Sequence, residues 1–105
     1  MSTDPRAAYE EVVSEMVITA GATAGQMFGM PCIKAGSKTF AGFWQAAMVF
    51  KLGGPEHGEA LALAGAHLFD PGMGRPMREW VVVPATHAAQ WPALARAAQR
   101  YVAGM

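Results

Sequence analysis

The sequence predicts a two-layer α+β domain in which helices pack on an antiparallel sheet of about four to five strands. Two observations support this fold class. Helix-like and strand-like segments follow one another in the order α-β-β-β-α-β(-β)-α, and the links between the first strand-like segments are short enough for hairpins. In addition, 52% of the 105 residues are hydrophobic and 15% are charged, which is enough apolar material for a core. Residues 1–105 are therefore interpreted as a single domain.

The first helix is predicted to begin at Pro5. The carboxylate of Asp4 can accept hydrogen bonds from free N–H groups of the first turn, and proline loses no hydrogen bond at the first helical position. A hydrophobic stripe with helical spacing follows and predicts one buried face. Its members are Tyr9, Val12, Val13, Met16 and Val17. Gly21 interrupts the pattern.

Three consecutive antiparallel strands are predicted between Gln26 and Leu52. Short apolar and aromatic runs alternate here with turn residues, in MFGMPCIK, TFAGFW and QAAMVFKL. The link over residues 35–38 suits a tight turn. Pro31 suggests that the first of these strands lies at a sheet edge or carries a bulge, because proline cannot donate to a ladder.

Alternation of side chains assigns faces to the second and third of these strands. Successive residues of a strand point to opposite faces of the sheet. Met48 and Phe50 are therefore expected on one face, with Val49 and Lys51 on the other. In the second strand one face is expected to carry Phe40, Gly42 and Trp44.

The second half of the chain predicts two helices and one or two strands. Gly53, Gly54 and Pro55 start a short helix that Gly65 can close. Residues 70–77 have the composition of a loop, and the β-branched run over residues 78–84 predicts a strand that ends at Pro84. Pro92 then begins a C-terminal helix. Its buried face is expected to carry Leu94, Ala95, Ala98, Tyr101 and Val102.

Charge and cysteine content narrow the class of protein. Eight basic residues balance eight acidic ones, so nucleic-acid binding would need a local basic patch. The one cysteine cannot form an internal disulfide, and the N-terminal segment lacks the pattern of a secretory signal. No apolar run approaches the roughly 20 residues that a transmembrane helix requires. We therefore expect a cytoplasmic protein without membrane association.

No set of residues matches a known catalytic, metal or cofactor motif. GSKT at residues 36–39 has the wrong spacing for a phosphate loop, and HGE at residues 57–59 lacks the two cysteines of a zinc deaminase site. The three histidines and Asp70 fit no metal-ligand spacing. No serine lies in a G-x-S-x-G turn. We expect no catalytic residues, no metal and no cofactor.

Five residues are nevertheless candidates for a ligand or partner surface. Cys32 is interpreted first as a small core residue, and alternatively as a reactive thiol with a cation, Lys34, two residues away. Guanidinium groups in the GRPMREW segment suit phosphate or other anions. The candidate surface comprises Cys32, Lys34, Lys38, Arg75 and Arg78.

Several segments together resemble the TfoX/Sxy N-terminal domain family, over residues 27–102. The resemblance is carried by the order of Met27-Phe28-Gly29, the Gly36–Lys38 hairpin, the aromatic strand Phe40–Trp44, Lys51, the loop Gly74–Met77 and Val83-Pro84. It implies an α+β domain with an antiparallel sheet, found alone or joined to a C-terminal domain in regulators of natural competence. It implies no catalytic residues.

Three functional hypotheses follow. The first is a noncatalytic TfoX N-terminal-like module with a regulatory role, which acts through a protein partner or self-association, for example as a homodimer. The second is nucleic-acid binding through the local basic residues Lys34, Lys38, Arg75 and Arg78. The third is small-ligand binding or catalysis that uses Cys32 and the Gly72–Met77 loop.

Overall fold

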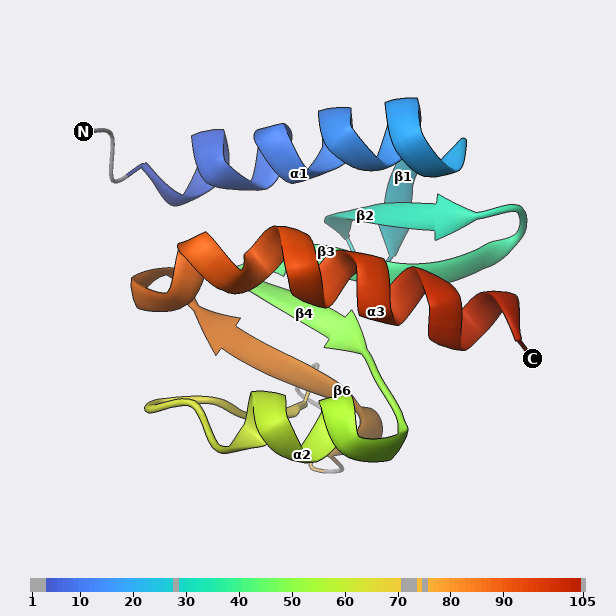
Figure 1. The fold of residues 1–105 in the computed structure, drawn as a ribbon. Helices are drawn as coiled ribbons and strands as arrows, with labels where there is room; N and C mark the ends of the chain where they lie inside the picture. Colours follow the sequence, from blue (N-terminus) through green and yellow to red (C-terminus); the bar gives the residue numbers. More distant parts are fainter. Residues whose placement is uncertain (1–3, 28, 71–73, 75, 105) are drawn as a thin grey trace.

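A computed structural model describes residues 4–27, 29–70, 74 and 76–104 (Figure 1). It confirms the α+β class and contains a six-stranded antiparallel sheet, slightly larger than expected. The elements in chain order are α1 (Pro5–Ala20), β1 (Thr23–Met27), β2 (Met30–Ala35), β3 (Lys38–Trp44), β4 (Ala47–Lys51), α2 (Gly54–Leu61), β5 (His67–Phe69), β6 (Met77–Pro84), the 3-10 helix η1 (Ala85–Gln90) and α3 (Trp91–Ala103).

The strands are ordered β1-β2-β3-β4-β6-β5 across the sheet. Figure 1 shows α1 and α3 side by side over the sheet, with α2 next to β6. Buried side chains of the helices and of one sheet face form the main core. The helices contribute Tyr9, Val12, Met16, Ala60, Trp91, Ala95, Ala98 and Val102, and the strands contribute Ile33, Phe40, Ala41, Met48, Phe50, Val81 and Val83. None of the helices described has the length and apolar character needed to cross a membrane.

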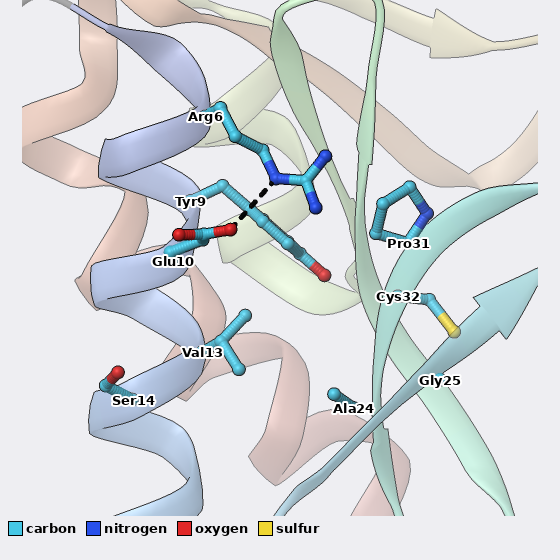
Figure 2. A pocket seen from close by; sticks show the side chains of 9 residues that line it. All are labelled: Arg6, Tyr9, Glu10, Val13, Ser14, Ala24, Gly25, Pro31 and Cys32. Atoms are coloured by element: carbon cyan, nitrogen blue, oxygen red, sulfur yellow. Dashed lines mark hydrogen bonds and ion pairs between the residues drawn. The ribbon is translucent and has the colours of Figure 1, made fainter.

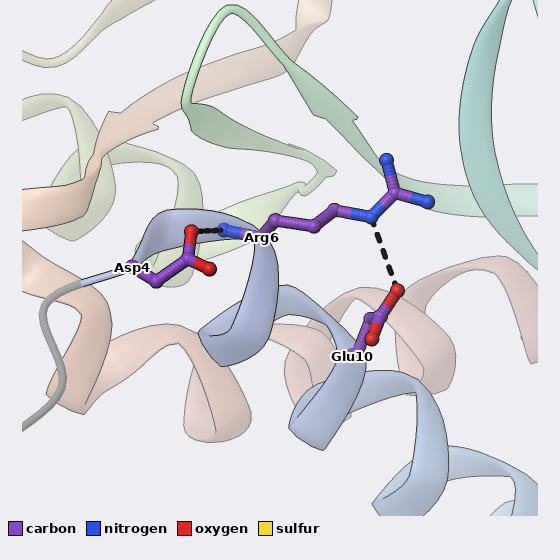
Figure 3. Close-up of polar contacts among 3 residues, drawn as sticks. All are labelled: Asp4, Arg6 and Glu10. Atoms are coloured by element: carbon purple, nitrogen blue, oxygen red, sulfur yellow. Dashed lines mark hydrogen bonds and ion pairs between the residues drawn. The ribbon is translucent and has the colours of Figure 1, made fainter.

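Helix α1 begins and ends as expected. The Oδ1 atom of Asp4 accepts a hydrogen bond from the backbone N–H of Arg6 at 3.0 Å (Figure 3). Gly21 ends the helix with φ of 66°, a left-handed conformation that glycine adopts without steric cost. Three residues of the predicted hydrophobic stripe, Tyr9, Val12 and Met16, are buried, Val13 is half-buried, and Val17 at the end of the stripe is 44% exposed.

Strand β1 was not predicted. It pairs antiparallel with β2, with Gly25 opposite Cys32 and Met27 opposite Met30. The segment GQMFGMPCIK therefore contains the end of one strand, a turn and most of the next strand. The sequence of β1, TAGQM, includes alanine, glycine and glutamine, so strand propensity did not indicate a strand here. Pairing with β2 determines the conformation of β1.

A bulge in β3 overturns one predicted set of faces. Ile33 pairs with Ala41 and Lys34 pairs with Thr39, which leaves Phe40 without a partner on β2. Phe40 and Ala41 consequently both join the helix-covered core, and the alternation shifts by one residue. Because of that shift, the prediction that Phe40 shares a face with Gly42 and Trp44 is wrong.

The two faces of β4 agree with the prediction, whereas Pro31 does not lie at a sheet edge. Met48 and Phe50 belong to the helix-covered core, while Val49 belongs to a second cluster on the other face, so this alternation is confirmed. The second cluster includes Phe69, whose ring meets that of Trp44 edge-on at 5.2 Å. Pro31 lies in β2, between β1 and β3, so the edge alternative is wrong. The alternative of a bulge agrees better with the structure, because the β2–β3 pairing shifts register between Ile33 and Lys34.

Candidate functional site

A cavity of about 350 Å³ lies between α1 and the β1–β2 hairpin (Figure 2). Helix α1 forms one wall, and the hairpin forms the other. The lining residues are Arg6, Tyr9, Glu10, Val13 and Ser14 from α1, and Ala24, Gly25, Pro31 and Cys32 from the hairpin. The α1 residues have the i, i+3, i+4, i+7 and i+8 spacing of one helical flank, so a regular helix is sufficient to bring them together.

The charged part of the cavity is an ion pair within α1. The Nε atom of Arg6 donates to Oε2 of Glu10 at 3.2 Å (Figure 3). The guanidinium carbon also lies 5.7 Å from the centre of the Phe43 ring, within the range of a cation–π contact. These two contacts hold the guanidinium group over the sheet, and Figure 2 shows it extending towards Pro31.

Tyr9 supplies a polar atom at the inner end of the cavity. The residue is 3% exposed, and its ring packs at 5.2 Å from that of Phe43. In Figure 2 its hydroxyl group points from α1 towards the hairpin, and no described residue forms a hydrogen bond with it. Because no buried side-chain oxygen or nitrogen of the described chain lacks a hydrogen-bond partner, this hydroxyl group reaches accessible surface in the cavity. Burial raises the pKa of the Tyr9 phenol well above its ordinary value, with Cys32 adding to the rise and Arg6 opposing it. The hydroxyl group is therefore protonated at neutral pH and can donate a hydrogen bond.

The raised pKa of Tyr9 predicts a loss of stability in alkali. The ordinary phenol pKa is 10.0, so above that pH the unfolded state releases the Tyr9 proton while the folded state retains it. Below pH 10.0 the contribution is constant, and above it the free energy of unfolding falls. The pKa of Tyr101, the other tyrosine of the chain, is also raised, because its hydroxyl group donates to the Glu79 carboxylate at 2.6 Å.

An absorbance titration of tyrosinate, together with unfolding curves at several pH values, checks this prediction. Neither phenol should ionise at its ordinary pKa while the protein is folded. The Tyr9→Phe variant should show a smaller loss of stability in alkali than the natural sequence. Ionisation of both phenols near pH 10.0 in the folded natural sequence would show that Tyr9 is not buried as described.

Cys32 lies in the hairpin wall and has no exposed surface. Its Sγ atom is 4.0 Å from Oγ1 of Thr39. In the view of Figure 2 the sulfur atom points away from the Tyr9 hydroxyl group. The thiol is therefore part of the packing of β2 in this structure, and the polar groups that reach the cavity come from α1.

The structure separates the other candidate residues predicted from the sequence. Lys34 lies on β2, with its side chain along β1, where a Cβ at Gly25 would meet the lysine Cε at 3.0 Å. Lys38 begins β3, and Arg78 lies on β6, where its carbonyl oxygen accepts a hydrogen bond from Nε2 of His57 at 2.6 Å. Arg75 lies outside the described residues, as do residues 72 and 73 of the Gly72–Met77 loop.

The sheet order shows which of these residues can act together. Strands β3 and β4 lie between Cys32 on β2 and Arg78 on β6, which corresponds to a separation of about 14 Å across the sheet. Cys32 and the start of β6 therefore do not form one site. Lys38 and Arg78 lie at the same end of the sheet, but β4 separates them. Lys51 ends β4 between them, 3.7 Å from the carboxylate of Glu79.

Sequence reasoning missed Arg6, Tyr9 and Glu10 as site residues. The i, i+4 spacing of Arg6 and Glu10 is a signal for an ion pair on a helix surface. It does not indicate that a hairpin faces this pair, because β1 was not predicted. Comparisons of the chain with protein-family models, with curated proteins and with solved structures find no match.

Proposed function

We propose that the protein is a noncatalytic association module of the TfoX N-terminal type that pairs with a second copy of itself through β1. The observation that carries this proposal is an open sheet edge. Strand β1 is the last strand on its side of the sheet, and TAGQM contains no charged residue and no proline. Exposed edge strands present backbone hydrogen-bonding groups, and monomeric proteins usually block them with charges, prolines, bulges or short length.

The other edge of the sheet has such protection. Strand β5 has three residues, and its pairing with β6 shifts register between Leu68 and Phe69. A short, irregular edge is a poor template for another strand. The β5 edge is therefore short and irregular, whereas β1 offers a longer edge without charged residues or proline. Addition of another strand is favoured at β1.

The β1 ladder leaves outward groups suited to symmetric pairing. Met27 pairs with Met30 across a two-residue turn, so these two residues form a hydrogen-bonded pair. Because hydrogen-bonded and non-hydrogen-bonded pairs alternate in an antiparallel ladder, the backbone N–H and C=O groups of Ala24 and Gln26 point away from β2. A twofold axis at Gly25 places Ala24 of one copy opposite Gln26 of the other. Both residue pairs can then exchange two backbone hydrogen bonds, and the assembly closes as a dimer.

Exposed hydrophobic side chains lie at the end of the helix that leads into this strand. Val17 and Ile18, with exposures of 44% and 82%, are the exposed large hydrophobic residues of the described chain. They lie in the last turns of α1, which leads through Gly21 and Ala22 into β1. Helical spacing places Val17 on the flank of Glu10 and Val13, the flank that faces the β1–β2 hairpin. Burial of these side chains would add a hydrophobic contribution to strand pairing.

The alternatives have less support. The candidate basic residues that the structure describes, Lys34, Lys38 and Arg78, lie on three different strands, and Glu79 is next to Arg78. The local positive potential of these three residues is therefore weak for nucleic-acid binding. The buried thiol of Cys32 is separated from Arg78 by two strands, which disfavours a common ligand site.

Substitution of Gln26 by proline tests the proposed dimer. Proline removes an outward N–H group and leaves the inward hydrogen bonds of β1 in place, so the fold should persist while the dimer dissociates. Light scattering should give about twice the 11.1 kDa chain mass for the natural sequence and the single-chain mass for Gln26→Pro. Circular dichroism checks that the variant is folded.

A second variant and a matched control test the hydrophobic contribution. Val17→Lys should weaken dimerisation, since it places a charge on the helix flank that faces the β1–β2 hairpin. Ala89→Lys adds the same charge at an exposed residue of η1 and should leave the dimer intact. A strict monomer for the natural sequence at millimolar concentration would refute self-association.

A further inference from the structure

We infer that the cavity between α1 and the β1–β2 hairpin binds a small organic monocarboxylate with a compact apolar body. The inference is independent of the proposed dimer. Ala24 is opposite Ile33, a residue of the helix-covered core, so the cavity uses the helix-facing side of β1. Pairing with a second copy would use the outer backbone edge of the same strand.

The size of the cavity sets the size of the ligand. Its volume of about 350 Å³ is near the lower end of the range for small-molecule sites, about 300–1,000 Å³. The lining is mixed: Val13, Ala24 and Pro31 supply apolar surface, and the polar side chains come from α1. This combination fits a ligand with one polar group and a short hydrocarbon or aromatic portion.

Arg6 is the group that would bind the carboxylate. Its Nε atom is occupied by Glu10, but its two terminal nitrogen atoms form no hydrogen bond or ion pair with the residues described. In Figure 2 they lie on the hairpin side of the guanidinium group. Two terminal N–H groups in one plane match the two oxygen atoms of a carboxylate, which gives stronger and more directional binding than a single charge contact.

Tyr9 provides a second, independent feature of a built site. Its ring is almost entirely buried, while its hydroxyl group reaches the accessible surface of the cavity and has no hydrogen-bond partner in the described chain. A hydroxyl group at the cavity wall that no protein group satisfies can donate to a ligand that enters the cavity. A carboxylate held by Arg6 would offer an acceptor to this hydroxyl group.

Glu10 determines which anions are acceptable. Its carboxylate lies 3.2 Å from the Arg6 Nε atom, so the pair is neutral as a whole. A ligand with a single negative charge replaces part of the solvation of Arg6, whereas a dianion such as phosphate would meet repulsion from Glu10. The cavity is therefore expected to prefer a monocarboxylate to inorganic phosphate.

Titrations of the isotope-labelled protein with sodium benzoate and sodium hexanoate, followed by NMR at constant ionic strength, test this inference. At least one of the two should produce saturable shifts confined to the first three turns of α1 and to the β1–β2 hairpin. Benzamide and hexanamide, the neutral counterparts, should bind at least about tenfold more weakly, because they cannot form the charged hydrogen bonds. Inorganic phosphate should bind more weakly than the carboxylate.

Two variants assign the binding groups, and a third serves as control. Arg6→Gln should weaken carboxylate binding about tenfold, and Tyr9→Phe should weaken it to a smaller extent. Arg96→Gln is the matched control, because Arg96 also pairs with a glutamate of α1, Glu15, but does not line the cavity. The Arg6 side chain is 54% exposed, so its replacement should leave the spectrum of a folded protein.

Each unfavourable result overturns the inference. Absence of saturable shifts with both carboxylates, equal binding of acid and amide, or unchanged binding in Arg6→Gln would each exclude the proposed carboxylate site. Stronger binding of phosphate would exclude the assigned ligand class. Because dimerisation is measured on Gln26→Pro and ligand binding on Arg6→Gln, the two proposals can fail separately.

Discussion

Replacement of Trp91 by alanine is expected to lower the free energy of unfolding by about 3–5 kcal/mol. Trp91 begins α3, has no exposed surface and is among the largest fully buried side chains of the protein. Its Nε1 atom donates to the carbonyl oxygen of Val83 at 3.3 Å. The substitution would leave a cavity between α3 and the sheet and remove a hydrogen bond from a buried carbonyl group.

Urea unfolding followed by circular dichroism measures this effect. The Trp91→Phe variant separates its two causes, because phenylalanine keeps most of the apolar volume but cannot donate to Val83. It should cost less than Trp91→Ala. A loss below about 1 kcal/mol for Trp91→Ala, the typical value for an ordinary substitution, would contradict the position of Trp91 in the core.

Replacement of Gly53 by alanine is expected to cost about 1–3 kcal/mol, because it overpacks the end of α3. A Cβ atom at Gly53 would clash with the ring of Tyr101. The three atoms nearest to this Cβ all belong to the ring, and even the farthest of them, Cδ1, would be only 2.9 Å away. The backbone itself permits alanine, since φ is −143°. The ring would have to move, and the hydrogen bond from its hydroxyl group to Glu79 would be lost.

Gly58→Ala provides the matched control for this prediction. Gly58 lies inside α2, and a Cβ atom there has no neighbour within 4 Å. Alanine is a better helix former than glycine, so this variant should gain about 0.5–1 kcal/mol. In a Tyr101→Ala background the cost of Gly53→Ala should disappear. Equal effects of Gly53→Ala and Gly58→Ala in thermal and urea unfolding would rule out the proposed conflict with Tyr101.

Local patterns predicted the features of the fold that depend on neighbouring residues. Asp4 and Pro5 indicated the start of α1, and Gly21 indicated its end, because capping involves residues only a few positions apart. The alternation of Met48, Val49 and Phe50 indicated the two faces of β4 for the same reason. These predictions required no knowledge of the partner elements.

The features that the sequence did not indicate depend on contacts between distant segments. Strand β1 forms because β2 provides a ladder for it, although TAGQM has little strand propensity. The bulge at Phe40 allows two consecutive residues to reach the helix-covered core, and it reverses the faces of the rest of β3. Val17 continues the apolar stripe of α1 but remains partly exposed near the open edge of the sheet.

The candidate site follows the same division. The sequence by itself determined that α1 would carry Arg6, Tyr9 and Glu10 on neighbouring turns, because helical periodicity depends only on spacing. Only the tertiary structure decided that the β1–β2 hairpin would face them, that Cys32 would be buried in its wall and that Arg78 would lie three strands from Cys32. The physical reason is that strand pairing and burial depend on which distant segments meet, whereas caps and periodicity are properties of the local chain.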